Sequence, residues 1–188
     1  MFDPSDLRKG LKILIDGQPY VITEFEFCKP GKGTALYRCR VKNMISGASM
    51  ERTYRPVDKL EKPDLEEKEV HYSYADGEFL VFSDMETYDE IRINKEVLKE
   101  QIHFLIENAE CKILFFNGKA IEVTIPVFVQ KKIIDTEPGF RGDTANNLMK
   151  PAKIDNGYEL QVPLFLNVGD VIKIDTRTGQ YVERVSKA

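Results

Sequence analysis

The feature that most constrains this 188-residue chain is a period-two alternation of apolar and polar side chains, which recurs in short runs along its length. Many apolar positions carry aromatic or β-branched residues, which suit strands with one buried face. The runs lie at 13–15, 20–25, 36–41, 70–74, 79–82, 88–93, 112–116, 121–125, 129–134, 160–162, 171–174 and 181–185. The pattern predicts an all-β protein built from many short strands.

Glycine turns separate several of these runs. An Asp-Gly or Asn-Gly pair tolerates the positive φ that a tight hairpin requires. The chain also has a weaker relative of this pair, Thr178-Gly179. The Asx-Gly pairs are Asp16-Gly17, Asp76-Gly77, Asn117-Gly118 and Asn156-Gly157. Short strands joined by such turns indicate small β-barrels.

One segment has a helical period instead. Asn94 is a suitable N-cap for a helix over 95–108. The apolar residues of that segment follow helical spacing: Leu98, Ile102, Leu105 and Ile106. We therefore expect one short helix, with His103 as a packing residue beside the apolar stripe, because a metal site needs several convergent ligands.

The charge is unevenly distributed, and the composition changes after residue 63 and near residue 126. Residues 1–63 carry 12 Lys or Arg against 8 Asp or Glu, residues 64–127 carry 6 against 15, and residues 128–188 carry 9 against 8. We predict three domains with these bounds, joined by short, semi-rigid links. The outer thirds indicate an anionic partner, whereas the acidic middle either meets a different partner or serves solubility.

Several classes of protein are disfavoured by composition. No apolar run is long enough to span a bilayer, and the N-terminus lacks the basic head and apolar core of a signal peptide. Three cysteines without CxxC spacing, Cys28, Cys39 and Cys111, fit neither a disulfide framework nor a zinc ribbon. We therefore expect a cytoplasmic protein without a membrane partner.

Catalytic motifs are missing as well. The chain has two histidines, His71 and His103, and lacks the GxxxxGK[ST], GxGxxG and GxSxG patterns. We expect no catalytic residues, no metal and no cofactor. A carboxylate pair far apart along the chain would leave no motif, so a small enzyme stays open as an alternative. Small β-barrels bind nucleic acids more readily than they perform chemistry, which favours a binding protein.

The most specific local feature is a hairpin tip within residues 27–35, with the sequence FCKPGKGTA. Pro30 stiffens the ascending strand, and Gly31 and Gly33 allow the backbone to reverse. Lys32 is left at the apex, with Lys29 at the base of the loop. From these residues alone, two interpretations are open. The tip either carries one cation into a narrow, anionic binding site, or is an ordinary solvated turn.

A resemblance to a known family decides between them. The tip KPGKG follows LKI at 11–13 and DGQPY at 16–20, and the last third carries longer matching stretches. These are DTEPGFRGDTA at 135–145, KPA at 150–152, VPLF at 162–165 and IKIDTRTGQYVERV at 172–185. In this order, and over essentially the full length, they resemble the bacterial elongation factor P family.

The resemblance implies a fold and a function. It implies an SH3-like barrel of the KOW type followed by two OB-fold barrels, arranged as an L. It also implies a monomeric factor, not an enzyme, that binds the ribosome between the peptidyl and exit sites. There the factor stabilises peptidyl-tRNA and relieves stalling at consecutive prolines. By resemblance, Lys32 is the residue that a lysine-modifying enzyme extends, and Gly142, Asp143 and Thr144 lie near messenger RNA in the exit site.

Other basic residues are candidate RNA contacts. Arg38, Arg40 and Lys42 alternate along one predicted strand and so share a face, where they either follow tRNA phosphates or only solvate the barrel. Tyr181 and Arg184 match the family's C-terminal signature and are candidates for stacking and phosphate contact. The alternatives for this second pair are strand packing and a surface ion pair.

Two questions stay open at this level. A general single-strand binder of the OB type is the main rival function, although the acidic middle and the net charge of −4 argue against it. The chemical state of Lys32 is the other question. β-Lysylation, a different aminoalkyl extension and an unmodified amine are all compatible with a lysine at the tip.

Overall fold

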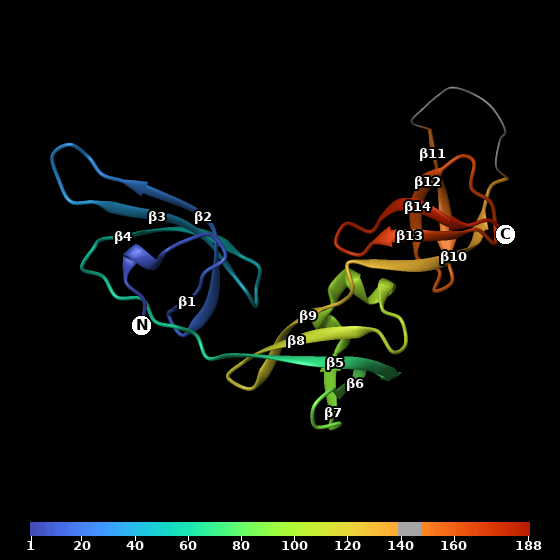
Figure 1. Ribbon diagram of the computed structural model, residues 1–188, viewed down its shortest axis with the longest axis horizontal. Helices are drawn as coiled ribbons and strands as arrows, with labels where there is room; N and C mark the ends of the chain where they lie inside the picture. Colours follow the sequence, from blue (N-terminus) through green and yellow to red (C-terminus); the bar gives the residue numbers. More distant parts are fainter. Residues whose placement is uncertain (139–147) are drawn as a thin grey trace. The chain divides into compact units, whose positions relative to one another are not determined.

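Fourteen β-strands in three sheets form nearly all the regular structure of this chain, in a computed structural model that describes residues 1–138 and 148–188 (Figure 1). Neighbouring strands such as β2 and β3, or β10 and β13, run antiparallel. The described helical segments are short 3-10 turns. The prediction of an all-β protein is therefore confirmed.

The first sheet has the order β1-β2-β3-β4. Its strands are β1 (Lys12–Ile15), β2 (Gln18–Cys28), β3 (Leu36–Asn43) and β4 (Ser49–Tyr54). The 3-10 turn η1 (Pro4–Asp6) precedes it. The hydrophobic core of this part of the chain is a cluster of buried residues: Leu7, Ile13, Ile22, Cys39, Val41 and Leu60.

The second sheet has the order β7-β6-β5-β8-β9. Its strands are β5 (Leu65–Asp76), β6 (Phe79–Asp84), β7 (Glu90–Asn94), β8 (Glu110–Phe116) and β9 (Lys119–Thr124). The third sheet has the order β12-β11-β10-β13-β14. Its strands are β10 (Phe128–Thr136), β11 (Met149–Ile154), β12 (Glu159–Pro163), β13 (Val171–Asp175) and β14 (Gln180–Ser186).

Two of the four Asx-Gly pairs form the expected tight turns, whereas at Asp76-Gly77 and Asn156-Gly157 only the glycine has a positive φ. Asp16 and Gly17 both have positive φ, 50° and 74°, in the two-residue turn between β1 and β2. Asn117 and Gly118 do the same between β8 and β9, with φ of 48° and 78°. Two successive positive φ values define the type I′ turn, whose twist matches that of the flanking strands.

The helix predicted over 95–108 is wrong in length and type. The segment forms two 3-10 turns, η2 (Lys95–Val97) and η3 (Lys99–Phe104). Asn94 does act as the cap, since its side chain accepts a hydrogen bond from the Glu96 amide at 2.9 Å. The helix cannot continue because Lys99 has a φ of +52°, outside the right-handed region.

The chain divides into two compact units, one of residues 1–68 and 113–123 and the other of residues 69–112 and 124–188. The second sheet contributes strands to both units. The three-domain boundaries drawn from composition, after 63 and after 127, stay a prediction.

Candidate functional site

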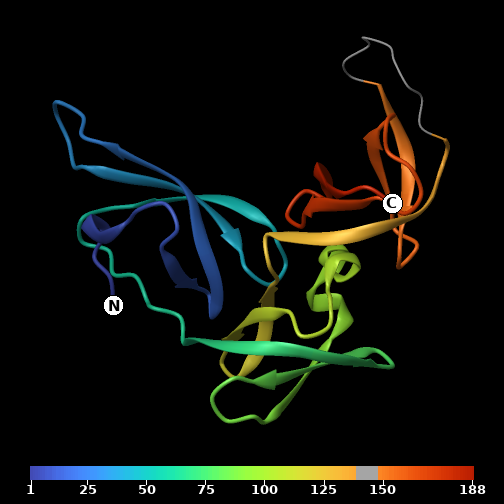
Figure 2. The ribbon, with the colours of Figure 1, turned by 45° about the vertical axis from the view of Figure 1, so that its right-hand side comes forward.

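A long two-stranded arm carries the segment that the sequence singled out. β2 and β3 stay paired from Tyr20 and Asn43 out to Cys28 and Leu36. The last buried residue of β2 is Ile22, six residues before the strand ends. On the paired strand β3, the buried residue nearest the tip is Cys39, which pairs with Phe25, three residues before β2 ends. At about 3.3 Å per residue, the end of β2 lies roughly 10 Å beyond this last core position. Figures 1 and 2 both show this hairpin extending away from the rest of its sheet.

The loop at the end of the arm exposes its lysines. Lys29, Pro30, Gly31, Lys32 and Gly33 are all exposed. Gly33 has a φ of +132°, a conformation that side chains with a Cβ rarely adopt, so a glycine is required there. Lys32 makes no ion pair or side-chain hydrogen bond with any residue that the structure describes. Its amine is therefore available to a partner.

Aromatic rings brace the arm. Tyr37 lies between Phe25 and Phe27, with ring centroids 6.3 Å and 5.1 Å apart. Phe25 is 38 % exposed and Phe27 is 50 % exposed, so these two rings lie outside the main core, against which Tyr37 packs. Such pairs add to hairpin stability beyond the area that they bury. The sequence predicted no role for these rings, although Phe25 and Phe27 precede the tip and Tyr37 follows it.

The predicted cationic face is present but mixed in charge. Arg38, Arg40 and Lys42 are exposed, and they alternate with buried Cys39 and Val41. This alternation places the three cations on one face of β3.

Carboxylates interrupt that face. Arg40 has one guanidinium nitrogen 3.2 Å from Glu24 and another 3.2 Å from Glu51. The strand register also places Glu26 opposite Arg38. Exposed pairs of this kind contribute little to stability, but they neutralise the cation. Arg38 and Lys42 are therefore the cations of this face best able to meet an anion.

The C-terminal candidates lie on β14. Arg184 has a guanidinium nitrogen 3.7 Å from the buried carboxylate of Asp170, and its guanidinium lies 5.2 Å from the centre of the Phe165 ring. Tyr181 is partly buried opposite Ile174, and this burial raises the pKa of its phenol. Both side chains thus have structural contacts already. Gly142, Asp143 and Thr144 lie outside the described residues.

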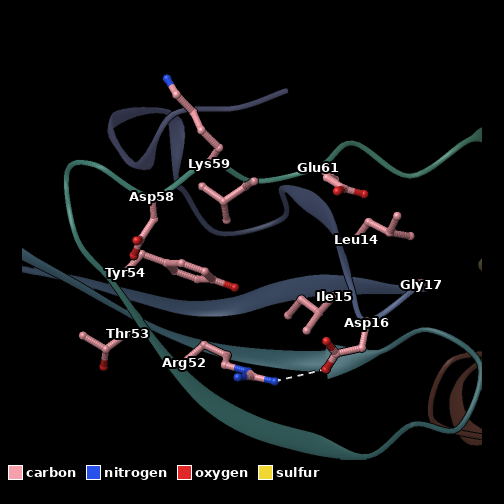
Figure 3. A pocket seen from close by; sticks show the side chains of 11 residues that line it. Leu14, Ile15, Asp16, Gly17, Arg52, Thr53, Tyr54, Asp58, Lys59 and Glu61 are labelled. Atoms are coloured by element: carbon pink, nitrogen blue, oxygen red, sulfur yellow. Dashed lines mark hydrogen bonds and ion pairs between the residues drawn. The ribbon is translucent and has the colours of Figure 1, made fainter.

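The first sheet also borders a pocket of about 560 Å³ (Figure 3). Its charges are mixed, and Arg52 lies 3.5 Å from Asp16 across it. Figure 3 shows Asp16 and Asp58 at opposite ends of the pocket and Lys59 pointing away from it. Asp16 and Asp58 therefore do not converge on one point, as a general acid and base would, and Glu61 is a third carboxylate of the lining.

Metal and thiol chemistry have little support. Within residues 1–138 and 148–188, no group of three His, Cys, Asp or Glu side chains is placed to hold a metal ion. Burial raises the pKa of Cys111 to about 11, so its thiol stays protonated at neutral pH. No described helix has the length and apolar character needed to cross a bilayer.

Comparison with known proteins agrees with this architecture. Three family models match in order: the elongation factor P KOW-like domain at residues 4–60, its OB domain at 65–123 and its C-terminal domain at 129–184. Elongation factor P of Desulfotalea psychrophila is 49 % identical over 187 residues, and that of Desulfosudis oleivorans is 51 % identical. Each alignment covers 100 % of both chains.

A solved structure supports the fold alone. Eukaryotic translation initiation factor 5A from Methanococcus jannaschii aligns with a TM-score of 0.57 and 21 % identity, over 66 % of this chain and 92 % of that chain. Together, the KOW-like sheet and the two OB domains define a translation factor and not an enzyme. The chain belongs to the elongation factor P family, as the resemblance of its sequence implied.

Proposed function

We propose that this factor binds the ribosome between the peptidyl and exit sites, stabilises peptidyl-tRNA and stimulates peptide-bond formation at consecutive prolines. The observation that carries the proposal is the position of Lys32. Its amine has no partner among the described residues and lies on the loop at the end of an arm whose strands reach roughly 10 Å beyond the core. Such an arm suits a narrow site that a barrel cannot enter.

The proposed mechanism is positioning. Proline is a constrained nucleophile, and a nascent chain ending in prolines holds the ester carbonyl poorly placed for attack. A factor that orders the acceptor end of the tRNA removes part of the entropic barrier without contributing a catalytic group. The ribosome performs the chemistry, which agrees with a translation factor that is not an enzyme.

Lys32 is also the proposed site of modification. A lysine between two glycines at an exposed apex offers a modifying enzyme little steric obstruction. Modification by β-lysylation or a different aminoalkyl group would lengthen the reach of the amine while keeping a positive charge. Intact mass spectrometry of protein from its native host distinguishes both from an unmodified lysine.

Further contacts complete the proposal. Arg38 and Lys42 are proposed to meet tRNA phosphates, with Arg40 contributing less because two carboxylates hold it. Gly142, Asp143 and Thr144 are proposed to approach messenger RNA in the exit site. Such a factor works as a monomer in the cytoplasm.

The test replaces Lys32 with alanine. The Lys32→Ala variant should keep the unfolding temperature of the parent, because an exposed surface substitution changes stability by within about 0.5 kcal/mol. It should lose most of the yield of a reporter that contains consecutive prolines. Lys119→Ala is the matched control, since Lys119 is another exposed lysine beside a hairpin turn. Full rescue by Lys32→Ala would overturn the proposal.

A further inference from the structure

A second pocket, of about 620 Å³, lies within the unit formed by residues 1–68 and 113–123. Four cations line it: Arg8, Lys9, Lys12 and Lys62. Glu67 is the one carboxylate among the described lining residues. We call this site the cationic pocket. Its volume is in the range of sites that hold a small organic ligand.

The four cations lack the ion-pair partners that Arg40, Arg52 and Lys59 of the same unit have. None of them makes an ion pair or side-chain hydrogen bond with the residues that the structure describes. In contrast, Arg52 pairs with Asp16 at 3.5 Å. Like charges gathered in a concave site raise the local potential and attract anions. The cationic pocket is therefore an electrostatic site for an anion, and the pocket of Figure 3 is not.

The cationic pocket also has apolar lining residues. Phe2, Leu11, Leu65 and Leu114 line it. Phe2 and Leu11 pack against the buried cluster of the first sheet, and Leu114 is only 8 % exposed. A lining of both apolar side chains and cations suits a ligand that has both a flat ring and negative charge. A nucleotide has both features.

The backbone fixes two of the cations in place. Gly10, with a φ of +87°, donates its amide to the Ile22 carbonyl at 2.7 Å. The Leu11 amide donates to the Arg8 carbonyl at 3.1 Å and closes the turn. Because this turn is tied to β2, Arg8 and Lys9 are presented by ordered backbone rather than by a free terminus. Ordering a site in advance lowers the entropic cost of binding.

We propose that the cationic pocket binds a nucleoside phosphate, either free or as a nucleotide of an RNA chain. Arg8, Lys9, Lys12 and Lys62 surround the phosphate, and Arg8 offers the planar fork that matches two phosphate oxygens. The apolar lining residues contact the base. This site is separate from Lys32, so it goes beyond the function proposed for the tip and is tested without ribosomes.

The experiment measures binding of adenosine 5′-monophosphate and of a six-nucleotide RNA to the full chain by calorimetry. The Arg8→Gln/Lys62→Gln variant should weaken binding by about tenfold or more, because it removes two charge-assisted contacts. For the RNA, the slope of log affinity against log salt should fall by about 1.4, at about 0.7 per lost phosphate contact on a single strand.

Two controls separate the site from general charge. Arg52→Gln/Lys59→Gln removes the same charge from the same unit at the other pocket and should leave both affinities nearly unchanged. The Arg8→Lys/Lys62→Arg variant keeps both positive charges and should retain most of the affinity of the parent. Thermal unfolding of each variant establishes that the fold persists.

The two probes distinguish a free nucleotide from a nucleotide within an RNA chain. Binding of the monophosphate supports a free nucleotide as the ligand, and binding of the RNA alone supports a chain nucleotide. Absence of binding by either probe at millimolar concentration overturns the proposal. An equal loss in the two glutamine double variants also overturns it, since net charge would then explain the effect. Neither result bears on the polyproline test of Lys32.

Discussion

The guanidinium of Arg184 on β14 lies 3.7 Å from the carboxylate of Asp170, a side chain that is fully buried. The same carboxylate accepts backbone hydrogen bonds from Asn167 at 3.0 Å and Ala188 at 2.9 Å. Asp170 therefore ties β14 and the end of the chain to the turn before β13. Arg184 is part of this network, which gives it a structural role whether or not it also meets RNA.

Replacing Asp170 with asparagine should destabilise the protein by about 2 kcal/mol or more, because an amide cannot replace a carboxylate that accepts from two backbone amides and an arginine. Thermal and denaturant unfolding measure the change. Glu159→Gln on β12 is the control, since Glu159 is exposed. Equal stability of the two variants would show that the buried carboxylate contributes nothing.

The same group should make stability depend on acid. Burial of Asp170 alone would raise its pKa, but the amides of Ala188 and Asn167, with Arg184 and Lys187 nearby, outweigh it and lower the pKa. A carboxyl with a lowered folded pKa contributes stability above its unfolded pKa of about 4 and loses it as the pH falls through the folded pKa. Denaturant unfolding between about pH 2 and pH 6 should show this loss, and Asp170→Asn should show less of it.

The sequence predicted most of the fold because the alternation and the Asx-Gly turns act locally. It missed β4 (Ser49–Tyr54), whose side chains are mostly exposed and so leave little hydrophobic pattern. It also missed β11 (Met149–Ile154), where Lys150 occupies a buried position. Lys150 donates hydrogen bonds to the carbonyls of Leu166 and Glu137, and burial lowers its pKa. A lysine facing inward breaks the pattern that identifies a strand.

The sequence likewise predicted only part of the candidate site. The exposed tip and the shared face of the β3 cations followed from glycines, proline and spacing. The pairing of Arg40 with Glu24 and Glu51 did not, because cross-strand neighbours depend on register. That register includes a bulge between Ile22 and Glu24, which shifts the pairing by one residue and which alternation alone does not locate.

The cationic face should contribute to ribosome binding through its unpaired members. Arg38→Gln/Lys42→Gln should weaken binding and lower its salt dependence by more than either single change, since each lost phosphate contact lowers the slope by about 0.7–0.9. Arg40→Gln should change the slope less, because two carboxylates already neutralise Arg40. Ribosome binding at several salt concentrations measures these slopes.

Lys95→Gln is the control for that series, since Lys95 lies on η2, in the other compact unit. Its slope should equal that of the parent. If the slope of the Arg38→Gln/Lys42→Gln variant is also unchanged, these side chains only solvate the sheet.

The aromatic cluster should affect the function of the tip because it stiffens the arm formed by β2 and β3. Tyr37→Ala removes both ring contacts and should cost about 1–3 kcal/mol locally, at about 0.5–1.5 kcal/mol for each pair. Amide exchange of β2 and β3 should quicken, and the polyproline reporter should lose yield although Lys32 is intact. Tyr37→Phe keeps the rings and should behave as the parent does. Full reporter yield with faster exchange would separate Lys32 function from the stiffness of the arm.

A tight contact at Gly179 offers a last test, because two glycines of similar φ differ only in their surroundings. Gly179 has a φ of +71°, and an added Cβ would lie 3.1 Å from the Tyr158 hydroxyl and 3.4 Å from the Phe104 ring. Gly157 has a φ of +82°, and nothing lies within 4 Å of a Cβ there. Alanine at either site costs about 1–2 kcal/mol for its backbone conformation.

Gly179→Ala should therefore destabilise the protein more than Gly157→Ala, because it must also displace Tyr158 from its stack with His103, where the ring centroids are 4.7 Å apart. Thermal unfolding gives the difference in stability between the two variants. The backbone cost of alanine is common to both and cancels in this difference. Equal unfolding temperatures would mean that Tyr158 moves away from the added methyl group at no cost in free energy. The stack of Tyr158 with His103 would then not hold η3 against the third sheet.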